Sequence, residues 1–82
     1  MRIVYTRSAE KEILKLNKPL GQRIFQKIEL LQNNPFGQGS EKLEGGKGYR
    51  LRIGDYRVIY TVDKENKIVN VTRVRHRKEV YR

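Results

Sequence analysis

Residues 49–62 hold the feature that most constrains the fold: two segments of alternating residues separated by a Gly-Asp pair. In residues 49–53, apolar side chains at every second position alternate with two arginines, and residues 56–62 repeat the alternation. A period of two, in segments rich in β-branched and aromatic residues, predicts two strands. Gly54 stands first in the two-residue connection, the position that glycine occupies in a type II′ turn. The sequence therefore predicts a β-hairpin with one apolar face.

The opposite face of this predicted hairpin is strongly basic. It carries Arg50, Arg52 and Arg57, and Asp55 in the turn is the one acid within the hairpin. Arginines packed this closely repel one another unless they meet anions or remain in water. The main question that the sequence raises is therefore what these arginines bind.

Two amphipathic helices are predicted before the hairpin. In residues 9–16 the apolar side chains fall on one face with charges opposite, and Thr6 and Ser8 are both possible N-caps. Pro19 suits the first turn of a second helix, in which apolar residues recur at helical spacing until the Asn-Asn-Pro of residues 33–35. We expect an antiparallel helix pair whose shared apolar face is covered by a sheet.

Further strands are predicted at the N-terminus and after the hairpin. Residues 2–5 are a short strand candidate, and residues 67–75 form a third strand next to the hairpin. This strand is antiparallel to the second because only residues 63–66 connect the two. Residues 36–48 hold five of the seven glycines and are interpreted as a plain connection. A phosphate-binding P-loop would need a GxxxxGK[ST] motif between a strand and a helix, which this segment lacks.

These elements give the order β-α-α-β-β-β in a single domain of residues 1–82. The predicted class is α+β, with two N-terminal helices packed on one face of a small antiparallel sheet. A chain of 82 residues buries roughly 60–65% of its unfolded surface, enough for a few layers of side chains. The lack of cysteine excludes disulfides and thiolate zinc sites. Without a leader-like segment or an apolar run of bilayer length, a soluble cytoplasmic protein is expected.

The net charge of +10 is concentrated in the half of the chain that contains the hairpin. From Lys47 onward there are eleven Lys and Arg against four Asp and Glu, a balance of +7. The first 46 residues carry eight against five, or +3. Such a field attracts polyanions, of which nucleic acid is the most abundant. A solvated basic surface or an acidic protein partner would account for the same charge.

Arginines of the third strand extend the basic face. Arg73 and Arg75 share one face of that strand, so a suitable register brings four or five guanidinium groups together. A guanidinium matches two phosphate oxygens at once, which lysine does not. The alternative is the ordinary charge that the solvent-facing side of a sheet needs. We favour a phosphate-binding surface, because arginine outnumbers lysine there and acids are absent from this region.

Groups that could transfer a proton are few. His76 is the only histidine, and the basic residues around it favour the neutral ring. Its imidazole, the Tyr81 hydroxyl or the Glu44 carboxylate could act as acid or base, although a lone histidine and a terminal tyrosine also serve as packing residues. No metal-ligand cluster, Ser/His/Asp set or cofactor motif is present. This set is similar to that of metal-independent ribonucleases, in which a 2′-hydroxyl attacks the adjacent phosphate and cations stabilise the transition state.

Three segments together resemble one known family. They are Lys42-Leu43-Glu44-Gly45, the run from Gly48 to Tyr60, and the ending from His76 to Arg82. With the β-α-α-β-β-β order, they resemble the RelE branch of the RelE/ParE toxin superfamily. The resemblance implies the toxin of a type II toxin–antitoxin pair, an endoribonuclease that cuts mRNA in the ribosomal A site. It also implies a small antitoxin that wraps the basic face and, as a complex with the toxin, represses their operon.

The resemblance carries roles over to individual residues. Arg57 matches the family's transition-state arginine, and Arg50 and Arg52 fall where RelE has two lysines. Because arginine stays charged, these two would hold phosphate and not transfer a proton. Arg77 matches a second family arginine near the C-terminus, and a two-residue length difference leaves Arg75 as the alternative.

Tyr81 matches the family's C-terminal tyrosine, and we expect no counterpart of the further C-terminal helix that some members have. The predicted catalytic set is Arg52, Arg57, His76, Arg77 and Tyr81. Proton transfer is assigned to His76 or Tyr81. The predicted RNA-binding residues around this set are Lys47, Arg50, Arg73, Arg75 and Lys78.

Two other functions are compatible with the same scaffold. A ParE-like toxin would bind DNA gyrase without catalysis, and a decayed toxin would retain only antitoxin binding. The apolar residues Ile59, Val69 and Val71 are candidates for the basic face, where an antitoxin helix would cover them.

Overall fold

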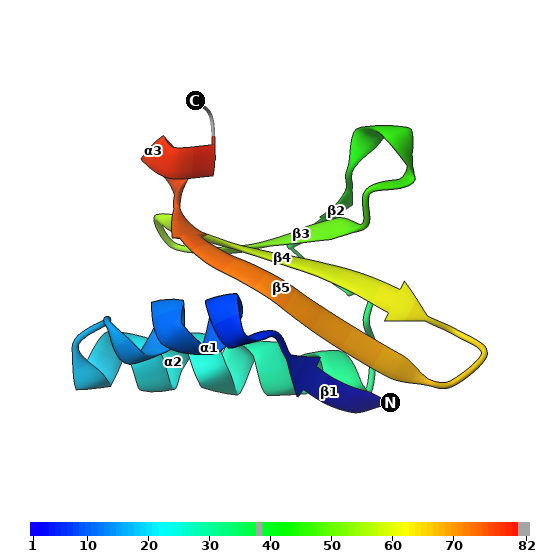
Figure 1. Cartoon of the computed structure of the whole chain (residues 1–82), viewed down its shortest axis with the longest axis horizontal. Coiled ribbons are helices and arrows are strands. Elements are labelled where there is room, and N and C mark those ends of the chain that lie inside the picture. Colours follow the sequence, from blue (N-terminus) through cyan, green and yellow to red (C-terminus); the bar gives the residue numbers. More distant parts are fainter. Residues whose placement is uncertain (38, 81–82) are drawn as a thin grey trace.

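The computed structural model describes residues 1–37 and 39–80, and Figure 1 shows their arrangement. The elements, with η for a 3₁₀ helix, are β1 (Arg2–Tyr5), α1 (Arg7–Leu14), α2 (Lys18–Glu29), η1 (Leu30–Gln32), β2 (Ser40–Lys42), η2 (Glu44–Gly46), β3 (Tyr49–Ile53), β4 (Tyr56–Asp63), β5 (Ile68–His76) and α3 (Arg77–Val80). The helices α1 and α2 run side by side beneath the sheet, and α3 lies past the end of β5 on the other side (Figure 1). The predicted α+β class is confirmed.

The five strands form one mixed sheet in the order β1-β5-β4-β3-β2. The strands β2 to β5 pair in antiparallel fashion, but β1 runs parallel to β5. The expectation of a purely antiparallel sheet is therefore wrong at this one pair. Short turns force antiparallel pairing only from β3 to β5, whereas both helices and three strands separate β1 from β5 along the chain.

Both long helices begin at side chains that cap them. The Thr6 hydroxyl accepts a hydrogen bond from the Ala9 amide at 3.1 Å, so Thr6 and not Ser8 caps α1. The Asn17 side chain accepts one from the Leu20 amide at 3.0 Å at the start of α2. Each cap satisfies an amide that has no partner within its own helix. The two caps thus set where α1 and α2 begin.

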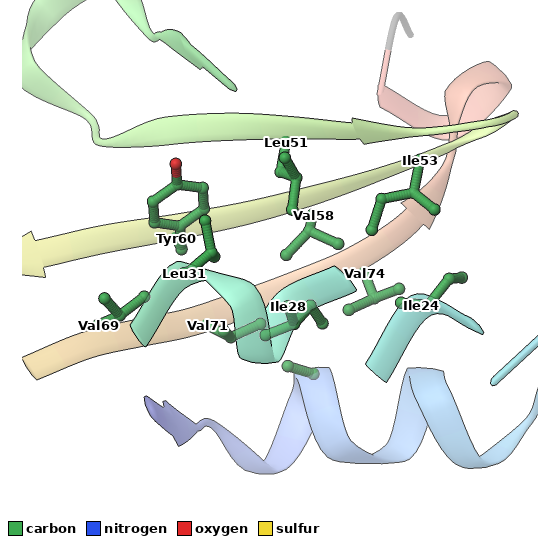
Figure 2. Packing of buried hydrophobic residues seen from close by; sticks show 11 residues of the cluster. Ile24, Ile28, Leu31, Leu51, Ile53, Val58, Tyr60, Val69, Val71 and Val74 are labelled. Atoms are coloured by element: carbon green, nitrogen blue, oxygen red, sulfur yellow. The ribbon is translucent and has the colours of Figure 1, made fainter. Parts of the chain in front are cut away.

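The core lies between the sheet and the helix pair. Figure 2 shows Ile24, Ile28 and Leu31, from α2 and η1, below the hairpin side chains Leu51 and Val58. The buried apolar residues are Ala9, Ile24, Ile28, Leu31, Leu51, Ile53, Val58, Tyr60, Val69, Val71 and Val74. Their removal from water is the main stabilising contribution to the fold.

An irregularity in β5 decides which of its side chains are buried. Ile59 of β4 pairs with Arg73, but the next residue of β4 pairs with Val71, which leaves Thr72 as an extra residue. Such a β-bulge reverses the alternation of side chains along the strand. Val69 and Val71 are consequently fully buried in the core. The prediction that these two valines lie on the basic face is wrong, whereas Ile59 does lie there.

The glycine-rich connection contains more regular structure than the sequence predicted. The strand β2 pairs with β3, and the turn η2 follows it. At Gly48, φ is +109° and a Cβ atom would lie 2.5 Å from the Tyr60 carbonyl oxygen, so only glycine fits. The Tyr60 hydroxyl in turn donates to the Pro35 carbonyl oxygen at 2.5 Å, and burial raises the pKa of this hydroxyl. Both ends of the connection therefore lie close to Tyr60 of β4.

The hairpin turn also holds the start of α3. Ile53 pairs with Tyr56, so Gly54 and Asp55 form a two-residue loop. Gly54 has φ +58° and Asp55 has no positive φ, as the predicted type II′ turn requires. The Arg77 amide donates to the Asp55 carbonyl oxygen at 2.7 Å. From Arg77 the chain makes one further helical turn, α3, which the sequence did not predict.

Candidate functional site

The sheet face opposite the helix pair carries the arginines that the sequence predicted to converge; we call it the arginine face. Arg52, Arg57 and Arg75 lie directly opposite one another on β3, β4 and β5 and form its central row. Side chains paired across strands in this way have Cβ atoms about 4.5–5.5 Å apart. Three guanidinium groups thus start from neighbouring positions on one surface.

A second row lies beside the central row on the same strands. It consists of Arg50, Ile59 and Arg73, and Glu41 of β2 lies opposite Arg50 at its end. The Arg50 Nη2 atom donates to Glu41 Oε2 at 2.6 Å. This hydrogen bond and the charge of Arg50 lower the pKa of the Glu41 carboxyl, with smaller contributions from the central row. Glu41 therefore lies within the positive field of the arginine face.

Arg57 is the most buried charged residue of the site, with 5% of its surface exposed. Its Nη1 atom donates to the carbonyl oxygens of Gly54 and Tyr56, both at 2.9 Å. Its Nε atom is buried without a hydrogen-bond partner. A buried charge with an unsatisfied donor costs free energy unless an anion meets it. The hairpin turn thus holds this guanidinium in a fixed position that an anionic ligand would stabilise.

Arg52 differs from Arg57 in being exposed. Its guanidinium makes no hydrogen bond or ion pair with residues in the described part of the chain. Long exposed arginines keep their rotamer freedom until a ligand orders them. The central row therefore combines one buried, hydrogen-bonded guanidinium with an exposed one beside it.

Acids on other elements contact the arginines of β5, which the sequence did not predict. Glu12 of α1 accepts from Arg73 Nη2 at 3.2 Å and from Arg75 Nε at 3.3 Å. Glu79 of α3 lies 4.0 Å from Arg75 Nε. The expectation that acids are absent from this region is therefore wrong. One signal was available: Glu12 stands three residues after the buried Ala9 and so borders the apolar side of α1.

His76 lies on the other side of the sheet from the central row. Its partner across the strands is Tyr56, and the two rings meet edge to face with centroids 5.3 Å apart. Tyr56 packs against the core, on the face opposite Arg57. The Nδ1 atom of His76 accepts a hydrogen bond from the Lys78 amide at 3.2 Å. The structure thus places the ring at the start of α3 and not among the guanidinium groups.

The remaining predicted residues are at the edges of the site. Arg77 and Lys78 are exposed on α3, with Arg77 Nε 3.8 Å from Asp55 Oδ1. Lys47 is exposed at the end of η2. In Figure 1, α3 and the segment containing η2 stand on the same side of the sheet, away from α1 and α2. Tyr81 lies outside the described residues.

This surface is suited to binding phosphate groups. Guanidinium groups donate paired hydrogen bonds to phosphate oxygens and stabilise negative charge that develops during a reaction. The described residues contain no group of three or more His, Cys, Asp or Glu side chains that could hold a metal ion. No helix in residues 1–37 and 39–80 is long and apolar enough to cross a membrane.

Comparison with known families gave one match that spans nearly the whole chain. A profile of the family described as "ParE toxin of type II toxin-antitoxin system, parDE" matches residues 3–81. A search of curated proteins gave no match.

Solved structures with the same fold include several RelE toxins. An archaeal RelE–RelB complex from Pyrococcus horikoshii is 29% identical, with a TM-score of 0.81 and 93% of each chain covered. The isolated RelE toxin of E. coli is 27% identical, with a TM-score of 0.79 over 98% of this chain and 89% of that one. The intact E. coli RelBE toxin–antitoxin complex is 25% identical, with a TM-score of 0.77 and coverages of 89% and 92%.

Proposed function

The chain belongs to the RelE/ParE toxin family of type II toxin–antitoxin systems, and we propose that it is an endoribonuclease that cuts mRNA on the ribosome. The observation that carries this proposal is the central row of the arginine face. Its middle member, Arg57, is held by the hairpin turn and has a buried Nε atom without a partner. A site that stabilises the transition state of cleavage at a phosphate needs a positive charge that is already in place before the reaction.

The proposed reaction is an attack by the ribose 2′-hydroxyl on the adjacent phosphorus. The 2′-oxygen forms a bond to phosphorus as the bond to the 5′-oxygen breaks, which gives a 2′,3′-cyclic phosphate and a 5′-hydroxyl end. Arg57 stabilises the added negative charge on the phosphate oxygens, and Arg52, opposite it on β3, binds the same group. Arg77 contributes a further positive charge from α3. No step requires a metal ion.

Proton transfer needs a group other than arginine, since arginine remains protonated. The candidates are His76 and Tyr81, one to take the proton of the 2′-hydroxyl and one to protonate the leaving 5′-oxygen. His76 lies beside Tyr56, and its Nδ1 atom already accepts a hydrogen bond. These contacts favour Tyr81 over His76 for the proton transfer that takes place beside the arginines.

Binding to the ribosome would use the rest of the basic surface. The residues proposed to contact RNA phosphates are Lys47, Arg50, Arg73, Arg75 and Lys78. Contacts of this kind weaken as salt rises, because RNA binding releases condensed counterions. We expect association with ribosomes to fall steeply between low and moderate salt.

The proposal is tested by mapping mRNA ends after induction of the protein in cells. Primer extension should show new 5′ ends within translated regions, and these should disappear with Arg57→Ala. The matched control is Arg7→Ala, which removes an exposed arginine from the start of α1, on the other side of the sheet. Growth arrest with intact transcripts would exclude the nuclease.

The second candidate function is inhibition of DNA gyrase without catalysis. It is favoured by the name of the matching profile, which describes the ParE branch of the family. Translation, mRNA integrity and plasmid supercoiling, followed in one induction experiment, separate the two. Loss of supercoiling with continued translation would support the gyrase inhibitor, and no toxicity at all would support a decayed toxin.

We further propose that a cognate antitoxin binds this chain. The net charge of +10 favours an acidic partner. Apolar side chains also remain exposed on the helix side, among them Leu14 at 76% and Phe25 at 46%, beside an open groove of about 720 Å³ between α1 and α2. Co-expression with the adjacent open reading frame, followed by affinity purification, tests whether the two form a stable complex.

A further inference from the structure

Glu12 links the helix layer to the arginine face, and the proposed reaction does not use it. Its Oε1 atom accepts from the Val74 amide at 2.8 Å. Its Oε2 atom accepts from Arg73 Nη2 at 3.2 Å and from Arg75 Nε at 3.3 Å. Only 20% of its side chain is exposed. A single carboxylate from α1 thus holds the backbone and two side chains of β5.

The contact with Val74 fixes the place of the carboxylate. The parallel pairing of β1 with β5 extends only as far as Val71. Beyond that residue, Glu12 binds an amide of β5 that the pairing with β1 does not reach. Buried backbone donors need such a partner. Since this bond ties Glu12 to the strand, the two arginines on either side of Val74 are oriented together.

Both arginines keep donors for a ligand. A guanidinium has five N–H groups, and Glu12 engages Arg73 at one amino group and Arg75 at Nε. The side chains of Arg73 and Arg75 are 41% and 38% exposed. The Nε atom of Arg73 is buried without a hydrogen-bond partner. Within residues 1–37 and 39–80, the contacts of Arg75 are made by its Nε atom, which leaves both amino groups for two oxygens of one phosphate.

The charge of Glu12 also has a consequence for the central row. Arg75 lies directly opposite Arg57, and like charges in such a pair destabilise a sheet. Glu12 contacts Arg75 from the α1 side of β5, whereas Arg57 is on β4, the other neighbour of that strand. Because the carboxylate partly offsets the charge of Arg75, it reduces the repulsion between Arg75 and Arg57 but leaves the pair net positive. The surface can therefore be ordered and still attract an anion.

We propose that Glu12 is a positioning residue of the arginine face, which orients Arg73 and Arg75 to bind RNA phosphates next to the one at Arg57. This inference rests on the proposed RNA-cleaving function. Glu12 itself contacts no RNA; it acts through the two arginines. Without its charge, each arginine would sample many rotamers, and binding would have to order them again.

The test is Glu12→Gln, because an amide oxygen can still accept from Val74 while the negative charge is lost. In a ribosome-dependent cleavage assay we expect KM for the ribosome–mRNA complex to rise roughly tenfold, as for a misdirected charged hydrogen bond, with kcat little changed. The matched control is Glu10→Gln, which makes the same charge change at an exposed position on α1. A purely structural role would lower the amount of active enzyme and leave KM unchanged. An unchanged KM in Glu12→Gln overturns the proposal.

A second measurement tests the orientation of Arg75 without RNA. Because it uses the unmodified protein, it also decides the case in which Glu12→Gln does not fold. In NMR spectra of the unmodified protein, the Nε–H of Arg75 should exchange with solvent more slowly than that of Arg52, which has no acceptor in the described structure. Equal exchange rates overturn the proposal whatever the cleavage assay gives. Absence of cleavage by the unmodified protein, with slow exchange at Arg75, instead rejects the proposed nuclease function and with it the RNA role of this contact.

Discussion

The two faces of the sheet are made by the same three strands but have opposite properties. The row of Leu51, Val58 and Val74 is buried against the helices. The adjacent central row places three arginines on the other face, and only Arg57 among them is buried. One face thus supplies stability and the other holds charge that the fold does not need. Register, and in β5 a single bulge, therefore decides which residues lie on each face.

The largest expected effect comes from placing an arginine on the wrong face. Strict alternation with Arg73 would put Val71 on the arginine face, but the bulge places it in the core. We therefore expect Val71→Arg to cost more than about 4 kcal/mol in the free energy of unfolding, because it buries an unpaired charge. Ile59→Arg, on the arginine face, should cost no more than about 1 kcal/mol. Urea denaturation of both variants measures this, and equal losses would contradict the bulge.

The next effect concerns the helix side alone. Ile28 is fully buried in the core, whereas Leu30, two residues later, is 60% exposed. Ile28→Ala should lower the free energy of unfolding by about 2–5 kcal/mol, and Leu30→Ala by less than about 0.5 kcal/mol. Cleavage per folded molecule should stay unchanged in both variants. A drop in that specific activity for Ile28→Ala would show that the two faces are not independent.

The central row should show the reverse behaviour. Arg57→Met keeps much of the side-chain volume and removes a buried charge whose Nε atom has no partner. Stability should change by no more than about 1 kcal/mol, since the lost hydrogen bonds are offset by the removed desolvation cost. Cleavage should fall at least about 100-fold, as when a preorganised donor is removed from an active site. Thermal unfolding and cleavage assays on one preparation test both; a large loss of stability would assign Arg57 to the fold.

Much of this comparison could be predicted from the sequence, because its signals are local. Period-two alternation and Gly54 predicted the hairpin, and helical spacing with Thr6 and Pro19 predicted the helix pair. Parity within strands was enough to place Arg52 and Arg57 on one face. These features depend on neighbours within a few residues, which is the range over which sequence patterns are informative.

Features that depend on distant pairing could not be predicted in the same way. The parallel pairing of β1, the bulge at Thr72 and the contacts of Glu12 each join segments far apart in the chain. Parity counted from Arg75 does place His76 on the opposite face, so its separation from Arg57 was available from the sequence. The sequence-based prediction instead placed His76 with the arginines because Arg75 and Arg77 are its neighbours along the chain.

The smallest expected effect is at the edge of the arginine face, where Glu41 meets Arg50. The pKa of Glu41 is lowered in the folded protein, chiefly by the hydrogen bond from Arg50. A carboxyl whose pKa is lower in the folded state contributes stability above its unfolded-state pKa of about 4.3, and this contribution is lost as pH falls through the folded-state value. The stability of the unmodified protein should therefore decline more steeply below about pH 4.3 than that of Glu41→Gln. Above about pH 5 the difference between the two should be constant.

The control is Glu44→Gln, which removes the same charge from the neighbouring turn η2, where no ion pair is formed among the described residues. The free energy of unfolding of the unmodified protein and of Glu41→Gln is measured by urea denaturation from pH 3 to 7. If the two change in parallel with pH, then Arg50 does not lower the pKa of Glu41, and Glu41 lies outside the positive field of the arginine face.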